Sequence, residues 1–338
     1  MLQELLSTAY TQRQTLIASL HNEKTTAYRL FHGTNEGQPG LTVDRYGELI
    51  LIQTFHKTLC DDEIQQVQDF YSKHLSYPHF CVYNDRSAAN SRYQNRFDSG
   101  DQGELTKEVI FQELGVSYLA QGRHKGQDPL LFLDFRAARR HVLQHSEGKD
   151  VLNLFSYTCG IGISAAVGGA KQVVNVDFAE SALAVGAENG HLNELDESRI
   201  QFIKSDFFTA ARQMAGLPIA TRRGRQSKLP KYDKIEARQF DLVVLDPPKW
   251  AKSPFGTVDL VRDYSSVFKP ALLCVKEGGQ ILCANNVAQV LLNDWLDMLQ
   301  RSAKKAGKPV KNIEVIKPEE DFPSRDGNYP LKMALLTV

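Results

Sequence analysis

Four short apolar runs in the second half of the chain constrain the fold more than any other feature of the sequence. They occupy residues 151–155, 173–177, 240–245 and 280–284. Such runs are typical of strands buried on both faces, and stretches long enough for helices lie between them. This alternation predicts an α/β, Rossmann-like domain with a mostly parallel, doubly wound sheet. Ligands of such sheets bind beyond the carboxyl ends of the strands.

The first third of the chain has a different pattern. A helical period runs through residue 20, and a glycine-containing turn at 45–48 separates two β-rich runs. A helix is expected at 61–74 and a strand at 80–83. Because 338 residues exceed the usual size of one domain, we expect a small α+β domain over 1–119, possibly binding substrate, and a catalytic domain over 120–338.

Composition narrows the class of protein. The opening residues lack a basic segment followed by an apolar run, which predicts a cytoplasmic protein without a membrane segment. The five cysteines are scattered and form no C-x-x-C pair, so neither a disulfide framework nor a metal site is expected. The formal net charge is zero, but residues 221–235 hold six basic residues against one acidic. This stretch is interpreted either as a solvated loop or as a loop that contacts phosphates.

A glycine-bearing turn follows the first apolar run. It contains Gly160 and Gly162 and leads into a helix, so a ligand can approach its backbone closely. The next run ends in Asp177, whose carboxylate can accept hydrogen bonds from a ribose. A dinucleotide-binding dehydrogenase and a methyltransferase that binds an adenosyl group both fit, since Ala165 is tolerated in the dehydrogenase pattern.

Two later segments favour the methyltransferase. Residues 204–208 and then Asp246-Pro247-Pro248-Lys249-Trp250 each follow an apolar run, and a dehydrogenase has no use for the second. Two prolines fix φ twice and remove two N–H donors, so this strand end presents acceptors suited to the donor edge of a nucleobase. Trp250 could stack on an extruded base, or cap the sheet as a core aromatic. The turn itself could be no more than a rigid strand exit, and Lys249 an exposed charge.

These motifs resemble the bacterial 23S ribosomal RNA methyltransferases of the large-subunit methyltransferase I and K type. The similar segments are residues 39–47, 133–136, 153–158, 246–249 and 329–332. The resemblance implies a small α+β domain before a class I methyltransferase domain, S-adenosyl-L-methionine as cofactor and a base of 23S rRNA as acceptor. The N-terminal PUA module of some relatives is not expected here.

The resemblance also implies roles for individual residues. Asp134 and Arg136 lie in the segment that closes over the cofactor, or else form a salt bridge that joins domains. Asp177 is expected to hold the ribose, Asp206 the adenine edge, unless it caps a helix, and Phe207 the adenine face. Asp246 is expected to orient the acceptor base, with Pro247, Pro248, Lys249 and Trp250 beside it. The full expected cofactor set is Asp134, Arg136, Asn153, Phe155, Ser156, Tyr157, Thr158, Gly160, Asp177, Phe178, Asp206, Phe207 and Asp246.

The acceptor atom is suggested by an absence in the sequence. Relatives that methylate carbon 5 of cytosine need a cysteine thiolate shortly after a Gly-Gly turn, and Asn286 stands at that place. The Asn285-Asn286 pair looks more like the branch that methylates a guanine ring nitrogen, so N-methylation is favoured. Cys283 is expected to be a buried thiol. Methylation of a protein amide or a small molecule, and a domain that binds RNA without turnover, remain as alternatives.

Overall fold

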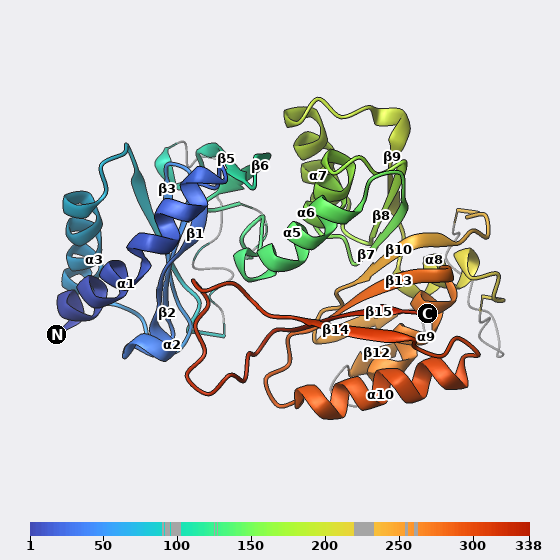
Figure 1. The fold of residues 1–338 in the computed structure, drawn as a ribbon. Helices are drawn as coiled ribbons and strands as arrows, with labels where there is room; N and C mark the ends of the chain where they lie inside the picture. Colours follow the sequence, from blue (N-terminus) through green and yellow to red (C-terminus); the bar gives the residue numbers. More distant parts are fainter. Residues whose placement is uncertain are drawn as a thin grey trace. The chain divides into compact units, whose positions relative to one another are not determined.

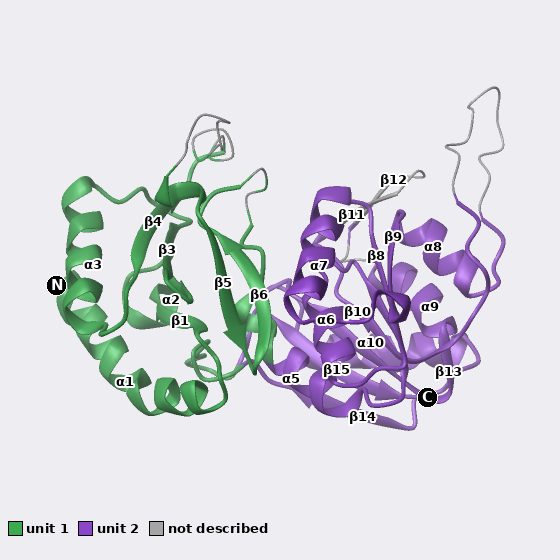
Figure 2. Cartoon of the chain, turned by 90° about the horizontal axis from the view of Figure 1, so that it is seen from above, with its two compact units in different colours: residues 1–136, 319–327 green, residues 137–318, 328–338 purple. Residues whose placement is uncertain are grey.

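The fold is taken from a computed structural model of the chain. It describes residues 1–89, 91, 95, 103–124, 126, 128–219, 233–253, 256–259 and 263–338, with the side chains of 250–258 left out. The chain forms two compact units (Figure 2). Residues 1–136 and 319–327 make the first unit, and residues 137–318 and 328–338 make the second.

The first unit is built on a four-stranded sheet in the order β1-β2-β3-β4, whose last pair is parallel. Helices α1 and α3 lie on one side of this sheet (Figure 1) and bury a core that contains Leu6, Val43, Ile52 and Tyr71. The helix expected at 61–74 is α3, and the expected hairpin is β2 with β3. The bounds are α1 Leu2–Asn22, β1 Ala27–His32, α2 Gly33–Glu36, β2 Leu41–Tyr46, β3 Leu49–Thr54, α3 Asp61–His74, β4 Phe80–Asp85, η1 Glu104–Thr106, β5 Glu108–Glu113, β6 Val116–Gln121 and η2 Leu133–Phe135.

The division at residue 119 that the sequence suggests does not coincide with this boundary. Residues 120–136 belong to the first unit, and so does the segment 319–327, which returns from near the end of the chain. Buried ion pairs explain the return. The guanidinium of Arg136 is fully buried and lies 2.8 Å from both Glu319 Oε2 and Asp321 Oδ2, while Asp321 also accepts the backbone N–H of Arg29.

The second unit contains a seven-stranded sheet in the order β14-β15-β13-β10-β7-β8-β9. Only β15 among its strands runs against the others, which confirms the predicted mostly parallel α/β fold. The bounds are α5 Arg136–His145, β7 Asp150–Leu154, α6 Gly160–Val167, β8 Gln172–Asp177, α7 Glu180–Leu192, η3 Glu197–Arg199, β9 Ile200–Lys204, α8 Phe207–Met214, β10 Phe240–Leu245, β11 Trp250–Ser253, β12 Gly256–Asp259, α9 Tyr264–Leu273, β13 Val275–Asn285, α10 Leu292–Lys305, β14 Asn312–Ile316 and β15 Lys332–Thr337.

Successive side chains of each strand point to opposite faces of this sheet. Leu152, Val174 and Val243 pack in one core cluster with residues of α8, α9 and α10. The alternate residues face the other side, where α6 crosses β8 so closely that a Cβ on Gly162 would lie 2.0 Å from Asn175 Oδ1. Glycine at position 162 therefore lets the helix approach the sheet.

The described residues contain neither a membrane-spanning helix nor a metal-binding cluster. Within them, no helix combines the length and apolar character needed to cross a bilayer. They also hold no group of three or more histidine, cysteine or acidic side chains that could bind a metal ion. All five cysteines are free thiols.

Candidate active site

The turn between β7 and α6 has an unusual backbone. Phe155, Tyr157 and Cys159 all have positive φ, at 56°, 48° and 62°, a region that non-glycine residues seldom adopt. Hydrogen bonds hold the turn, because Ser156 N–H donates to Val176 O at 3.0 Å and Cys159 N–H donates to Ser156 O at 2.7 Å. Left-handed residues that the surroundings over-determine cluster at ligand sites, so this turn is a candidate binding element.

Asp177 ends β8 and connects two turns. Its carboxylate is 8% exposed and accepts the backbone N–H of Tyr157 on Oδ2 and that of Ala179 on Oδ1, both at 2.9 Å. A carboxylate has about four acceptor positions, so each oxygen can still accept a hydroxyl proton. The position expected to hold a ribose therefore fits a ribose, and its orientation is fixed by backbone donors.

Phe178 follows directly and is 70% exposed. A phenylalanine so open to solvent next to a buried carboxylate has no role in the core. It offers a flat apolar face of the kind on which a nucleobase stacks. Carboxylate and ring together fit the two halves of an adenosine.

Other residues expected at the cofactor turn are inside the unit. Asn153 is 3% exposed and donates its amide to Asn175 Oδ1 at 3.0 Å, across neighbouring strands. Ser156 and Thr158 are also buried, and Thr158 O accepts a hydrogen bond from Asn189. Gly160 is the first residue of α6 and is buried. These residues shape the turn from within.

Asp206 and Phe207 lie at the start of α8. Asp206 is the N-cap, with Oδ1 accepting Thr209 N–H at 3.0 Å, so the helix-capping alternative is present in the structure. Phe207 is 6% exposed, and its ring stacks on that of Phe155 with centroids 4.8 Å apart. Phe207 thus packs against the turn between β7 and α6 through Phe155. The contacts of Asp206 and Phe207 with adenine stay predictions.

The Asp-Pro-Pro turn leaves the carboxyl end of β10. Pro247 is buried, Asp246 is half-buried, and Pro248 and Lys249 are exposed. Strands β10 and β13 are parallel neighbours with Leu245 opposite Cys283, so the ends of both strands share one edge. The side chain of Trp250 lies outside the described residues, as do residues 220–232, which hold most of the basic stretch 221–235.

A residue absent from the expected site ends β13 at this edge. Asn285 is 3% exposed, and its Oδ1 accepts Val287 N–H at 2.9 Å. Its Nδ2 is buried without a hydrogen-bond partner among the residues described. An unpaired buried donor is costly and is found at functional sites. The sequence gives only a position after an apolar run, and the unpaired nitrogen becomes visible in three dimensions.

Cys283 lies beneath this edge and is fully buried. Burial raises the pKa of its thiol far above the ordinary range, although a hydrogen bond with Tyr264 acts in the opposite direction. The Tyr264 hydroxyl donates to Ala284 O at 2.8 Å, and burial, Cys283 and Asp246 all raise its pKa. Cys283 is therefore a neutral core thiol, as expected.

Asp134 and Arg136 lie in the first unit. The Asp134 carboxylate, together with that of Asp44, raises the pKa of Arg29 against the lowering effect of burial. Arg136 is surrounded by Glu113, Glu319 and Asp321 and donates to Ala27 O at 3.1 Å. Arg136 therefore forms salt bridges, but these three partners lie with it in the first unit, so the bridges do not join the two units as that alternative expects. A cofactor contact of either residue stays a prediction.

The described site thus consists of a left-handed turn, a carboxylate held by two backbone donors, an exposed ring and a proline-stiffened acceptor turn at one edge of a parallel sheet. This combination defines a Rossmann-like enzyme that binds an adenosyl cofactor. Residues 28–337 match the S-adenosylmethionine-dependent methyltransferase family, and the chain belongs to that family. Its cofactor is S-adenosylmethionine, and it is an enzyme of the class that the sequence predicts.

Curated relatives share most of the chain. It is 30% identical over 302 residues to "Ribosomal RNA large subunit methyltransferase I" of Escherichia coli (strain SMS-3-5 / SECEC), covering 88% of this chain and 70% of that protein. The protein of the same name from Aeromonas salmonicida (strain A449) is 31% identical over 304 residues with the same coverage. These relatives confirm the resemblance that the sequence motifs indicated.

Solved structures share the fold. A methyltransferase-like protein in complex with SAH is 24% identical, with a TM-score of 0.73, and the alignment covers 100% of this chain and 81% of the other. A second such protein, from Streptococcus mutans, gives the same TM-score and coverage at 22% identity. The folds of both units therefore recur in these solved structures, and the second unit has the class I methyltransferase fold.

Proposed function

We propose that this methyltransferase modifies a base of 23S ribosomal RNA in the cytoplasm and that the acceptor is a nitrogen atom. The observation that carries the proposal is the Asp246-Pro247-Pro248 turn beside the unpaired amide of Asn285, at the edge where the cofactor-binding turn ends. A carboxylate acceptor and an amide donor form a complementary pair for the edge of a nucleobase. The name printed for the curated relatives, ribosomal RNA large subunit methyltransferase, supports RNA as the substrate.

Nitrogen is favoured over carbon 5 because the chain offers no thiolate at this edge. Carbon 5 methylation requires a nucleophile that adds to the ring. Cys283 is fully buried and its pKa is raised by burial, so it stays protonated at neutral pH. Asn286, at the position of the expected nucleophile, is exposed and cannot add to a ring.

The residues of the chain then act by positioning. The bound cofactor supplies a methyl group on a sulfonium. Asp177 would hold the ribose of the cofactor, and Phe178 would stack on its adenine. The left-handed turn would contact the remaining edge of the cofactor. Asp246 would accept a hydrogen bond from the acceptor base and align the nitrogen with the methyl group. Pro247 and Pro248 keep this carboxylate rigid, and Lys249 and Trp250 follow on the same turn.

The proposal is tested with purified protein, S-adenosylmethionine and 23S rRNA from cells that lack the gene. Nucleoside mass spectrometry should show one methylated base with the methyl group on nitrogen. The variant Asp246→Asn presents a donor in place of an acceptor, and its kcat should fall by about 100-fold while cofactor affinity stays within a few-fold. The exposed Asp294 on α10 gives the matched control Asp294→Asn.

Three other results have distinct meanings. Cofactor binding with no change in any RNA, but with methylation of a protein or small molecule, would replace RNA by that substrate. RNA binding without cofactor binding would indicate a domain without turnover. Unchanged RNA affinity at low salt in the triple variant Arg222→Ala, Arg223→Ala, Arg225→Ala would remove the basic stretch from the RNA-binding surface.

A further inference from the structure

A small pocket opens in the first unit, on the face of the sheet that does not pack against α1 and α3. About 380 Å³ of non-atom space lies between its lining residues, the open solvent at its mouth included. Its floor consists of Leu51 and Gln53 on β3 and Asn84 on β4. Its wall consists of Arg86, Asn95, Gln121, Gly122, Arg123, His124, Gly126, Asp128 and Pro129. Every lining residue belongs to the first unit.

Gln53 brings an unpaired donor into this pocket. It lies opposite Asn84 on the neighbouring parallel strand and is 2% exposed. Its Nε2 has no hydrogen-bond partner within the described part of the chain. The Asn84 amide beside it donates to Gly122 O at 2.8 Å and accepts from Arg123 Nε at 3.0 Å. Among the described residues nothing accepts from this donor, and a bound ligand with an acceptor oxygen would satisfy it.

Two arginines add positive charge. Arg123 is held in place because its Nε donates to Asn84 and its Nη2 donates to Tyr83 O at 3.0 Å. No carboxylate among the described residues pairs with Arg123. Arg86 pairs with Asp128 at 2.7 Å, where the acidic side chain is 50% exposed. Within the described part of the pocket, the charge of one guanidinium is therefore not compensated by a carboxylate, and its planar group is already oriented.

His124 contributes no charge at neutral pH. Its Nδ1 accepts the backbone N–H of Gly126 at 2.9 Å, so the ring proton is on Nε2, which donates to Asp128 O at 2.8 Å. This is the neutral tautomer, and burial lowers the pKa of the ring accordingly. The histidine therefore shapes the wall and leaves the charge to the arginines.

We propose that this pocket binds one phosphate group of the RNA backbone, which Arg123 contacts as a charged donor and Gln53 as a neutral one. The inference rests on the proposed RNA substrate and adds a contact in the first unit. Donors and positive charge select an anion, and one oriented guanidinium beside one amide suits a single phosphate group. A phosphate contact fixes the register of the RNA without reading its sequence.

The test uses the full chain and a fluorescent fragment of 23S rRNA in anisotropy titrations across a range of salt concentrations. Arg123→Gln should weaken binding about three- to tenfold and lower the slope of log K against log salt by about one. Gln53→Glu has nearly the same shape but repels phosphate, so it should weaken binding more than Gln53→Leu does. Lys73→Gln, at an exposed position on α3, is the control and should leave affinity and slope unchanged.

Each outcome decides between explanations. Circular dichroism melts identify variants that fail to fold, and Arg123→Lys then tests the site because it keeps the charge and should retain the salt slope. If the wild type binds and methylates RNA while Arg123→Gln and Gln53→Glu leave its affinity unchanged, the pocket assignment is overturned. If calorimetry shows that the pocket takes inorganic phosphate and the variants change only that, the RNA contact is overturned. If the wild type binds no RNA, the proposed function itself is wrong.

Discussion

The carboxylate of Asp177 accepts the backbone N–H of Tyr157 at 2.9 Å, so the end of β8 fixes the turn that follows β7. The same carboxylate accepts Ala179 N–H with its other oxygen. One side chain therefore sets two loops at the edge where the cofactor is expected. Because each oxygen holds one loop, replacing either oxygen by a group that cannot accept a hydrogen bond should disturb the site.

The variant Asp177→Asn replaces one acceptor oxygen by an NH₂ group, which then faces a backbone donor. Because a hydrogen bond to a charged group contributes about 1.5–3 kcal/mol, affinity for S-adenosylmethionine should fall roughly 10- to 100-fold. Calorimetry measures this directly. Glu188→Gln, exposed on α7, is the control and should bind as the wild type does. Equal affinities in both variants would remove Asp177 from the cofactor site.

Phe178 gives a second prediction at the same edge. Since the ring is 70% exposed, Phe178→Ala should leave the melting temperature unchanged. Loss of a stacked base costs about 1–3 kcal/mol, so cofactor affinity should fall at least about fivefold. Phe178→Tyr keeps the flat face and should restore binding. An alanine variant with normal affinity would show that adenine stacks elsewhere.

Some parts of this fold can be predicted from the sequence and others cannot. Four strands of the second unit, β7, β8, β10 and β13, are predicted because buried parallel strands are continuous apolar runs, and α3 because its apolar residues follow a helical period. Strands β9, β14 and β15 are not among the predicted ones. The segment 319–327 was not predicted, since its carboxylates meet Arg136 from about 180 positions away and no local pattern records that meeting. The hairpin of β5 and β6 carries a weak signal, an alternation in residues 108–113 ahead of the Leu114-Gly115 turn.

Within the site, the sequence could place residues at strand ends but could not show which groups are already paired. Asn153 and Phe207 lie in segments that the sequence assigns to the cofactor site. In the structure, however, Asn153 is hydrogen-bonded to Asn175, and the ring of Phe207 stacks on that of Phe155. In the sequence Asn285 is only one of a pair of asparagines, whereas the structure shows that its amide nitrogen has no partner among the described residues. Hydrogen-bond satisfaction is a property of the packed chain, and it separates these residues.

Arg136 gives a prediction about stability. Replacement by methionine would leave buried carboxylates of Glu113 and Asp321 without their cation, which costs about 3–5 kcal/mol of unfolding free energy. Urea titration measures the loss. The double variant Arg136→Met, Asp321→Asn should recover part of it, because one uncompensated charge is removed. If the Arg136→Met variant instead has the unfolding free energy of the wild type and fails to bind cofactor, Arg136 acts at the cofactor site.

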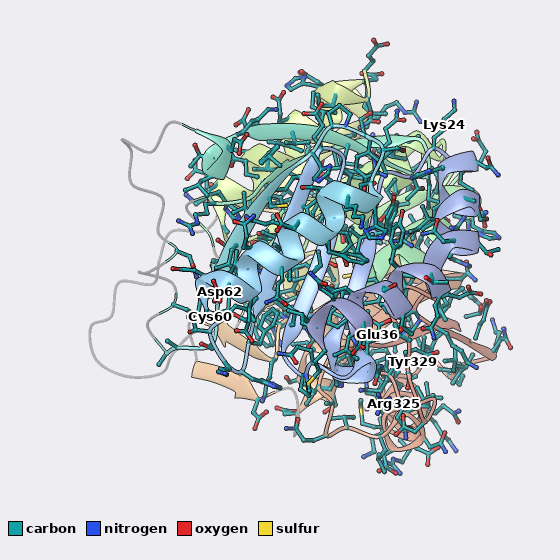
Figure 3. All side chains as sticks on the ribbon, turned by 90° about the vertical axis from the view of Figure 1, so that its left-hand side faces the viewer. Lys24, Glu36, Cys60, Asp62, Arg325 and Tyr329 are labelled. Carbon is teal, nitrogen blue, oxygen red and sulfur yellow. The ribbon has the colours of Figure 1, made fainter. Side chains whose placement is uncertain are left out.

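The cysteines provide a test of the methylated atom. Cys60 is exposed at the start of α3 (Figure 3) and should react with a thiol reagent at pH 8. Burial raises the pKa of Cys159 and of Cys274 to about 12 and that of Cys283 further, so these three should react only after unfolding.

The variant Cys283→Ala should then cost about 1 kcal/mol of stability and keep RNA methylation within about twofold of the wild type. Cys60→Ala is the control for the loss of a thiol as such. Abolished turnover in a folded Cys283→Ala protein would establish a covalent step and with it carbon 5 chemistry.

His32 predicts how the first unit responds to acid. Its Nδ1 lies 2.9 Å from Arg29 Nη1, and since a guanidinium only donates, Nδ1 must accept and the ring must be neutral. Burial, with Arg29 and Arg13 nearby, lowers the pKa of His32 to about 4, although Asp321 acts in the opposite direction.

Between pH 6.5 and 4 the unfolded chain therefore binds a proton at His32 that the folded chain does not. Stability should be complete above pH 6.5 and fall by up to about 3 kcal/mol as the pH drops to 4. Urea titrations at a series of pH values measure this slope. His32→Asn keeps an acceptor for Arg29 and cannot titrate. The stability that this variant loses between pH 6.5 and 4 should therefore be smaller than the loss of the wild type by up to about 3 kcal/mol. A variant with the slope of the wild type would assign the acid sensitivity to other groups.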